Sequence, residues 1–192
     1  MSGGATVEGD ERLRLFLALE LPPDVVAELG RWGARHLPRG RRLETLHVTL
    51  AFLGSRPRAE LDAILDALRG EAARTRSFPL EPVRYRETRS VGMLVLDDRS
   101  GEATGLAGRL HDRLEGLGVY EREGRPWLPH LTVLRFRERP RLSPPLPSLG
   151  QFAPSGAAAF LSRLHPSGAR YEVLESCPLG ENGDTPTLTH GG

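Results

Sequence analysis

Lysine is absent from this 192-residue sequence, because all 26 residues counted as lysine or arginine are arginine. Guanidinium groups form bidentate hydrogen bonds with phosphate, so an arginine-only chain is compatible with phosphate binding. A genomic base composition that favours arginine, alanine, glycine and proline codons explains the same bias more simply. The formal net charge is only +1, so charge by itself indicates neither a nucleic-acid partner nor its absence.

Cysteine is nearly absent too, since Cys177 stands alone. One thiol cannot form an internal disulfide, which favours a reducing compartment. The N-terminal segment is polar and acidic and has no apolar stretch of the kind found in secretory signals. No run of about 18 apolar residues predicts a membrane span. We therefore expect a cytoplasmic, soluble globular protein with no membrane partner.

Hydrophobic patterning predicts an α+β fold. Residues 12–21 alternate strictly between leucine and other residues, which is typical of a half-buried strand. Further strands are predicted over residues 44–53, 78–88, 91–98 and 130–137, helices over 22–37, 56–72 and 101–117, and a terminal hairpin over 158–176. Ser55 is a plausible N-cap of the second helix.

The two ends of the chain lack any apolar pattern. We predict a disordered lead-in over residues 1–11, a single domain over 12–179 and a mobile tail over 180–192. Residues 138–150, rich in proline, arginine and serine, are predicted to be a loop.

A His-x-Thr pattern occurs twice, in LHVTL and in PHLTV, with the two histidines 83 positions apart (130 − 47). Side chains alternate along a strand, so His47 and Thr49 share one face while their aliphatic neighbours share the other. The same split applies to His130 and Thr132. If the two strands lie side by side, two imidazoles and two hydroxyls meet in one pocket.

Such a pocket suits a phosphodiester. A neutral imidazole accepts a proton from the attacking oxygen, and a protonated imidazole gives one to the leaving oxygen. Threonine hydroxyls donate hydrogen bonds to the phosphate oxygens. The pattern does not say which histidine is the acid, and a polar strand edge without catalysis remains the alternative.

Metal chemistry is the main competing use of histidine. The chain has no HExxH motif and no cluster of cysteine and histidine. Two histidines leave a catalytic zinc short of the three protein ligands that it usually takes. We therefore expect no metal and no other cofactor.

With these motifs the chain resembles the two-histidine (2H) phosphoesterases, and among them the RNA 2′,3′-cyclic phosphodiesterases also called 2′-5′ RNA ligases. The resemblance covers about residues 12–180 and rests on RLFLALELPPDV, LHVTLAFLG, RPWLPHLTVLRF and FLSRLHPSGARYEVLESCPL. It implies a bilobal α+β fold of two antiparallel-rich sheets, with helices outside and a central cleft. It also implies metal-independent hydrolysis of RNA 2′,3′-cyclic phosphate ends to 2′-phosphomonoesters.

The resemblance further implies roles for residues. His47 would be the proton donor, and His130 the proton acceptor that activates water. Thr49 and Thr132 would hold the phosphate. Arg135 occupies the place of an arginine that follows the second motif and would neutralise a phosphate oxygen.

On a straight strand Arg135 faces away from His130, so its participation requires a bulge near Leu134. The arginine groups 39–42, 84–89 and 135–141 either flank the cleft, where they would attract RNA, or form solvated surfaces, which is the commoner case.

The expected partner is RNA with a 2′,3′-cyclic phosphate end, such as a tRNA fragment, or a small cyclic nucleotide, and we expect a monomer. Two alternatives stay open: reversible 2′-5′ ligation of tRNA halves by the same residues, and a non-catalytic module that binds nucleotides or RNA ends.

Three side chains near the motifs carry weaker predictions. Phe52 shares the parity of the core-facing Leu50 and is predicted to be core. His111, on the third helix, is predicted to be solvated. Trp127 either lines the cleft or packs, and the base-stacking residue stays open.

Overall fold

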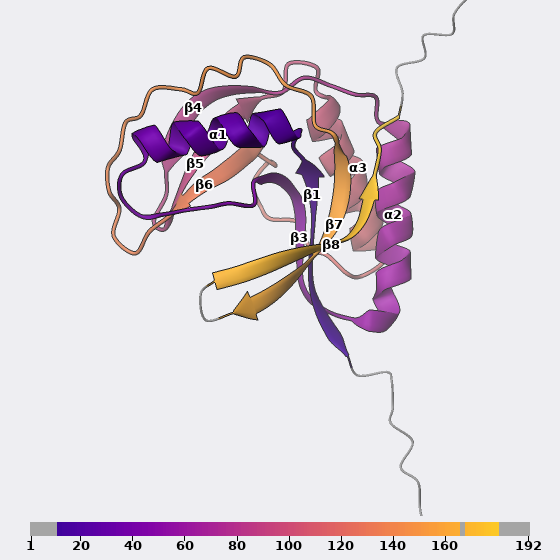
Figure 1. Ribbon diagram of the computed structural model, residues 1–192. Coiled ribbons are helices and arrows are strands. Elements are labelled where there is room, and N and C mark those ends of the chain that lie inside the picture. Colours follow the sequence, from indigo (N-terminus) through magenta and orange to yellow (C-terminus); the bar gives the residue numbers. More distant parts are fainter. Residues whose placement is uncertain (1–10, 166–167, 181–192) are drawn as a thin grey trace, which may run out of the picture.

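The computed structural model describes residues 11–165 and 168–180 (Figure 1). The predicted lead-in and tail lie outside this part, apart from Glu11 and Gly180, which are held by backbone hydrogen bonds. The elements are β1 (Arg12–Glu20), α1 (Pro23–His36), β2 (Arg41–Arg42), β3 (His47–Pro57), the 3-10 helix η1 (Arg58–Glu60), α2 (Leu61–Arg74), β4 (Glu81–Glu87), β5 (Val91–Asp97), α3 (Glu102–Gly116), β6 (His130–Arg135), β7 (Gly156–His165) and β8 (Gly168–Cys177).

The strands form one eight-stranded sheet in the order β4-β5-β6-β3-β1-β7-β8, with β2 paired to β6. Every pair of these strands is antiparallel, so the predicted α+β class is confirmed. Where two sheets were expected, the halves β4–β5–β6 and β3–β1–β7–β8 are joined through β3 and β6. That junction is narrow, because Val48 opposite Leu131 is its one paired position among the described residues.

β1 separates two apolar layers, because its side chains alternate between the faces of the sheet. Its leucines enter the main core beneath the helices: Leu13, Leu15, Leu17 and Leu19. Phe16 and Ala18 lie on the opposite face and form a second cluster with Ala158 and Phe160 of β7. The second layer covers the sheet face that carries His47, whose ring lies 4.8 Å from that of Phe16.

The helices divide between the two halves of the sheet. Figure 1 shows α1 beside β4, β5 and β6, and the ring of Trp32 on α1 lies 6.5 Å from that of Tyr85 on β4. α2 and α3 lie together beside β3, β7 and β8. None of the described helices is long and apolar enough to cross a membrane.

The predicted N-cap at Ser55 is wrong. β3 continues past Gly54, whose φ of +68° is a left-handed conformation that favours glycine. Ser55 therefore pairs with Arg14 of β1 instead of opening a helix. The turn into α2 is η1, so α2 begins at Leu61.

The loop over residues 138–150 is anchored by buried groups. The Glu87 carboxylate accepts hydrogen bonds from Arg139 Nε at 3.1 Å and from the backbone N–H groups of Arg141 and Leu142 at 3.0 and 2.8 Å. Further along, the Trp32 indole N–H donates to the carbonyl of Pro145 at 2.8 Å. The loop is therefore tied to the β4 half of the sheet despite lacking regular structure.

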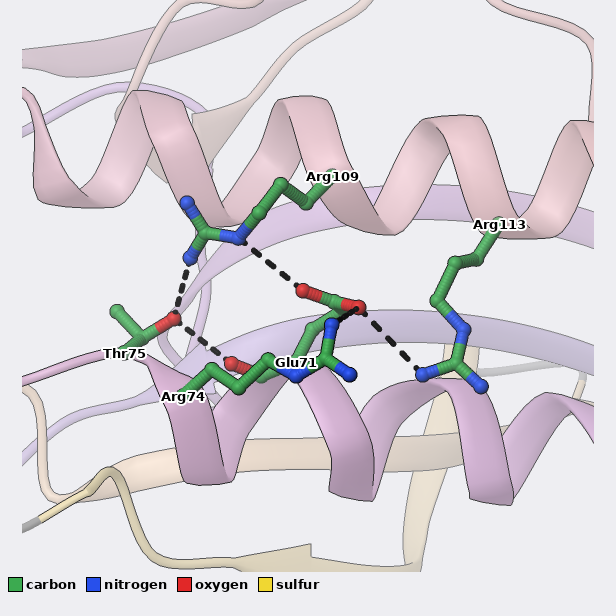
Figure 2. Close-up of polar contacts among 5 residues, drawn as sticks. All are labelled: Glu71, Arg74, Thr75, Arg109 and Arg113. Carbon is green, nitrogen blue, oxygen red and sulfur yellow. Dashed lines mark hydrogen bonds and ion pairs between the residues drawn. The ribbon is translucent and has the colours of Figure 1, made fainter.

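α2 and α3 are joined through the carboxylate of Glu71, which is only 2% exposed (Figure 2). Arg109 Nε lies 3.1 Å from it, Arg113 3.4 Å and Arg74 3.5 Å. Arg109 also donates to the hydroxyl of Thr75 at 2.8 Å, and that hydroxyl donates to the Glu71 carbonyl. A buried carboxylate is tolerated here because several guanidiniums neutralise it.

Glu71→Gln keeps the shape of this side chain but removes its charge. We expect the free energy of unfolding at pH 7 to fall by about 2 kcal/mol, because charge-assisted hydrogen bonds at a buried group are lost. Equilibrium unfolding in urea measures the change. As a control on α3, Asp112→Asn removes the exposed pair with Arg122 in the loop that follows and should cost less than about 0.5 kcal/mol. Equal losses in the two variants would contradict the structural role of Glu71.

Candidate active site

The register between β3 and β6 makes the two motifs cross-strand neighbours. Val48 lies opposite Leu131 in an antiparallel pair, so His47 falls beside Thr132 and Thr49 beside His130. Neighbours of this kind have Cβ atoms roughly 5 Å apart and share a face of the sheet. The strand pairing therefore makes the two motifs neighbours on one face of the sheet, and of their four polar residues His47 and Thr49 line the cavity described below.

A bulge in β3 changes which side chains accompany His47. Ala18 of β1 lies opposite Thr49 and Leu17 opposite Ala51, so Leu50 is an extra residue without an opposite partner. An extra residue reverses the alternation beyond it. Phe52 is therefore 51% exposed and on the motif face, and the prediction that it belongs to the core is wrong.

β6 also carries a bulge. Gly92 of β5 lies opposite Leu134 and Met93 opposite Thr132, which leaves Val133 as the extra residue. Both Val133 and Leu134 are buried. Arg135 consequently lines the same cavity as His47. The bulge that its participation required is present, one residue before the expected position.

Side chains from β1, β2, β3, β6, β7 and β8 line an open cavity of about 400 Å³. Its lining residues are Arg14, Phe16, Arg41, His47, Thr49, Phe52, Arg135, Ser162, Ala169 and Tyr171. In the described part of the chain, none of the three arginines among them forms an ion pair with a carboxylate. The guanidinium of Arg14 instead lies 4.9 Å from the ring centre of Phe52. The cavity is therefore positively charged and suited to an anionic ligand.

Aromatic side chains surround His47. Its ring lies 5.7 Å from that of Phe160 and 5.6 Å from that of Tyr171, in addition to the contact with Phe16. Sequence reasoning missed these three residues. The signal for Phe16 was present, since it is an apolar residue on the polar face of an alternating strand.

Burial lowers the pKa of His47 to about 4, and the neighbouring charges of His130 and Arg135 act in the same direction. The backbone of Thr45 opposes the shift, but Nδ1 of His47 has no hydrogen-bond partner of normal geometry among the described residues. His47 is therefore neutral at pH 7 in the free protein. A bound anion would favour its charged form.

The ring of His130 is oriented by the backbone that immediately precedes β6. Nδ1 lies 2.8 Å from the carbonyl oxygen of Leu128. A carbonyl oxygen only accepts, so Nδ1 carries the proton, and Nε2 of the neutral ring keeps a free lone pair. This tautomer is the one in which Nε2 can accept a proton.

Two further side chains contact the backbone of the first motif. Trp127 Nε1 donates to the carbonyl of Thr49 at 3.0 Å. His111 Nε2 lies 2.7 Å from the carbonyl of Leu50, and the His111 side chain is only 6% exposed. The prediction that His111 is solvated is therefore wrong, because α3 packs against β3 and the ring bonds to the bulge.

Potential metal donors are few around this cavity. In the described ranges, no group of three or more His, Cys, Asp or Glu side chains is placed to hold a metal ion. The polar side chains that line the cavity with His47 carry hydroxyls or guanidiniums, and guanidiniums do not bind metal ions. The donor set suits an oxyanion.

The two His-x-Thr strands are neighbours in one antiparallel sheet, beside a cationic cavity lined by His47, Thr49 and Arg135. The chain has the 2H phosphoesterase fold. Residues 21–163 match the 2′-5′ RNA ligase superfamily. The chain belongs to that superfamily.

Named relatives extend this assignment. The RNA 2′,3′-cyclic phosphodiesterase of Thermus thermophilus is 33% identical over 190 residues, covering 89% of this chain and 93% of that protein. The protein of the same name from Escherichia coli is 29% identical over 176 residues, covering 88% and 98%. The crystal structure of E. coli LigT complexed with 3′-AMP has a TM-score of 0.74 at 27% identity, covering 88% of this chain and 99% of that chain.

The unusual pKa of His47 can be measured directly. We expect its imidazole to titrate near pH 4 in the free protein. NMR of the ring protons follows this titration. Inorganic phosphate should raise the pKa, because an anion beside the ring stabilises the imidazolium. Arg135→Gln should raise it as well by removing a nearby positive charge. Arg139→Gln, which alters a guanidinium bonded to Glu87, should leave it unchanged, and a normal His47 pKa in the free protein would contradict the burial argument.

Proposed function

We propose that this protein is an RNA 2′,3′-cyclic phosphodiesterase that hydrolyses the cyclic end to a 2′-phosphomonoester. The observation that carries the proposal is the Val48–Leu131 pairing, which sets both His-x-Thr motifs on one sheet face. The names of the E. coli and T. thermophilus relatives support the same activity.

Water is the attacking group in this reaction, and His130 is its base. Nε2 of His130 takes one proton from water while the water oxygen forms a bond to phosphorus. The bond between Nδ1 and the Leu128 carbonyl supports this role, because it fixes the tautomer and orients the ring.

His47 is the proton donor. As the bond between phosphorus and the 3′ oxygen breaks, the His47 imidazolium gives its proton to that oxygen, leaving a 3′ hydroxyl and a 2′ phosphate. A pKa of about 4 in the free protein does not suit this role at pH 7. When the phosphodiester anion binds, its negative charge raises the pKa of the adjacent His47 ring and so favours the protonated form.

The remaining groups hold the phosphate. Thr49 and Thr132 donate hydroxyl hydrogen bonds to the non-bridging oxygens, and Arg135 compensates their charge. Thr49 and Arg135 line the cavity with His47, which supports this assignment. Donors fixed by a sheet need little reorganisation as negative charge develops.

The proposed substrates are RNA ends that carry a 2′,3′-cyclic phosphate, such as those of tRNA fragments. Small cyclic nucleotides carry the same reactive group without the RNA chain and serve for comparison. Arg14 and Arg41 line the cavity beyond the motifs, and cations at these positions favour a chain with further phosphates. We propose a monomer that acts in a reducing compartment, the cytoplasm, in keeping with the single buried cysteine.

Hydrolysis of an oligonucleotide 2′,3′-cyclic phosphate in EDTA tests the activity. We expect a 2′-phosphate product, and we expect His47→Ala and His130→Ala each to lower kcat by about 10²–10⁴-fold, as loss of a general acid or base does. His36→Ala, at the end of α1, should retain activity. A 3′-phosphate product would contradict the proposed leaving group.

The same experiment distinguishes two other functions from hydrolysis. Joined product with added 5′-hydroxyl RNA would indicate 2′-5′ ligation. Tight nucleotide binding with no turnover by the wild-type protein would indicate a binding module and overturn the proposal.

The dependence of rate on pH follows from His47. The profile of kcat/KM reports the free enzyme, so activity that needs protonated His47 should decline above its pKa of about 4. The profile of kcat reports the bound state, in which the substrate anion raises that pKa. We expect the alkaline limb of kcat to lie at least about one pH unit above that of kcat/KM. Superimposable limbs in the two profiles would contradict His47 as an anion-dependent proton donor.

A further inference from the structure

The ladder between β3 and β6 ends immediately after the motifs. Val48 pairs with Leu131, so continuing the antiparallel register would set Leu50 opposite Pro129. Proline has no backbone N–H and cannot donate to a strand partner. On the other edge of β3, Leu50 is the extra residue of the bulge opposite β1. The backbone around Thr49 and Leu50 therefore lacks part of the regular sheet bonding.

Side chains from outside the two strands supply donors at this point. Trp127 donates its indole N–H to the carbonyl of Thr49 at 3.0 Å. His111 on α3 lies 2.7 Å from the carbonyl of Leu50, and its Nε2 must carry the proton because a carbonyl oxygen only accepts. Two consecutive carbonyls of the first motif are thus each bonded to a side chain. A buried carbonyl left without a donor would destabilise this backbone conformation.

The segment from Trp127 to His130 connects the two motifs. The Trp127 side chain is bonded to Thr49 of the first motif. One residue later, the carbonyl of Leu128 accepts the hydrogen bond that orients His130 of the second motif. A displacement of this segment would therefore move the Thr49 hydroxyl and the His130 ring relative to each other.

We propose that Trp127 and His111 are positioning residues that hold the Thr49 hydroxyl in register with the His130 imidazole for a shared phosphoryl group. The inference rests on the proposed function, because a phosphoryl group is what Thr49 and His130 would share. It assigns to two side chains a role that neither His-x-Thr motif contains. A small displacement of catalytic groups is enough to lower the rate strongly.

The chain offers a matched control for the indole hydrogen bond. Trp32 is buried and donates to the Pro145 carbonyl at 2.8 Å, and Pro145 belongs to neither motif. Trp127→Phe and Trp32→Phe therefore make the same chemical change. With a cyclic nucleotide as substrate, Trp127→Phe should lower kcat about tenfold with KM within about threefold, since one hydrogen bond is lost. Trp32→Phe should lower stability at least as much and leave kcat within about twofold; equal kcat in the two variants overturns the proposal for Trp127.

His111 is tested by rescue. His111→Leu removes the donor, and we expect a loss in kcat of about tenfold. His111→Gln keeps an N–H donor on a side chain of similar length and should retain kcat within about threefold of wild type. Equal losses in the two variants, measured at a temperature where both are folded, overturn the positioning role of His111.

A measurement without turnover separates this proposal from the proposed function. Inorganic phosphate is added to each protein, and the pKa of His47 is followed by NMR. The rise in this pKa should be smaller in Trp127→Phe than in wild type and unchanged in Trp32→Phe. No rise in the wild type, or the same rise in both variants, overturns the positioning role. If the rises differ as expected but wild type hydrolyses no cyclic phosphate, the proposed function fails alone.

Discussion

One strand pairing determines the candidate site: β6 lies antiparallel to β3 with Leu131 opposite Val48. Both residues are fully buried, so apolar burial on one face fixes the register. Because side chains alternate, the same register brings the histidines and threonines of both motifs together on the other face. If one strand slipped by one residue, its side chains would exchange faces of the sheet and the two imidazoles would no longer share a face. The main core therefore sets the geometry of the polar face from the opposite side of the sheet.

The cavity depends equally on departures from regular strands. A bulge in β3 brings Phe52 to the motif face, and a bulge in β6 does the same for Arg135. Regular strands would send both side chains to the core. At the β3 bulge, the Trp127 and His111 side chains donate to the backbone carbonyls of Thr49 and Leu50. The irregular backbone is therefore supported by specific hydrogen bonds, as is common next to active sites.

This difference explains what could be predicted from the sequence. Alternation in residues 12–21 and around each His-x-Thr motif is local, so β1 and the faces of His47 and His130 were predicted correctly. Bulges are set by how neighbouring strands pair, so parity failed for Phe52. The participation of Arg135 in the site could be predicted only on the condition that β6 carries a bulge. The contact between His111 and Leu50 joins positions 61 residues apart, and helix periodicity carries no information about such a contact.

Electrostatics complete the connection between fold and chemistry. Three arginines line the cavity, and the His47 imidazole stays neutral because burial and positive neighbours disfavour its charge. Protonating that ring in the empty cavity would add a buried charge beside others of the same sign. A phosphate anion bound beside these arginines would reverse the balance, because its negative charge favours the imidazolium. Under the proposed mechanism the substrate itself would therefore create the proton donor, and acid catalysis would be limited to the state in which an anion is bound.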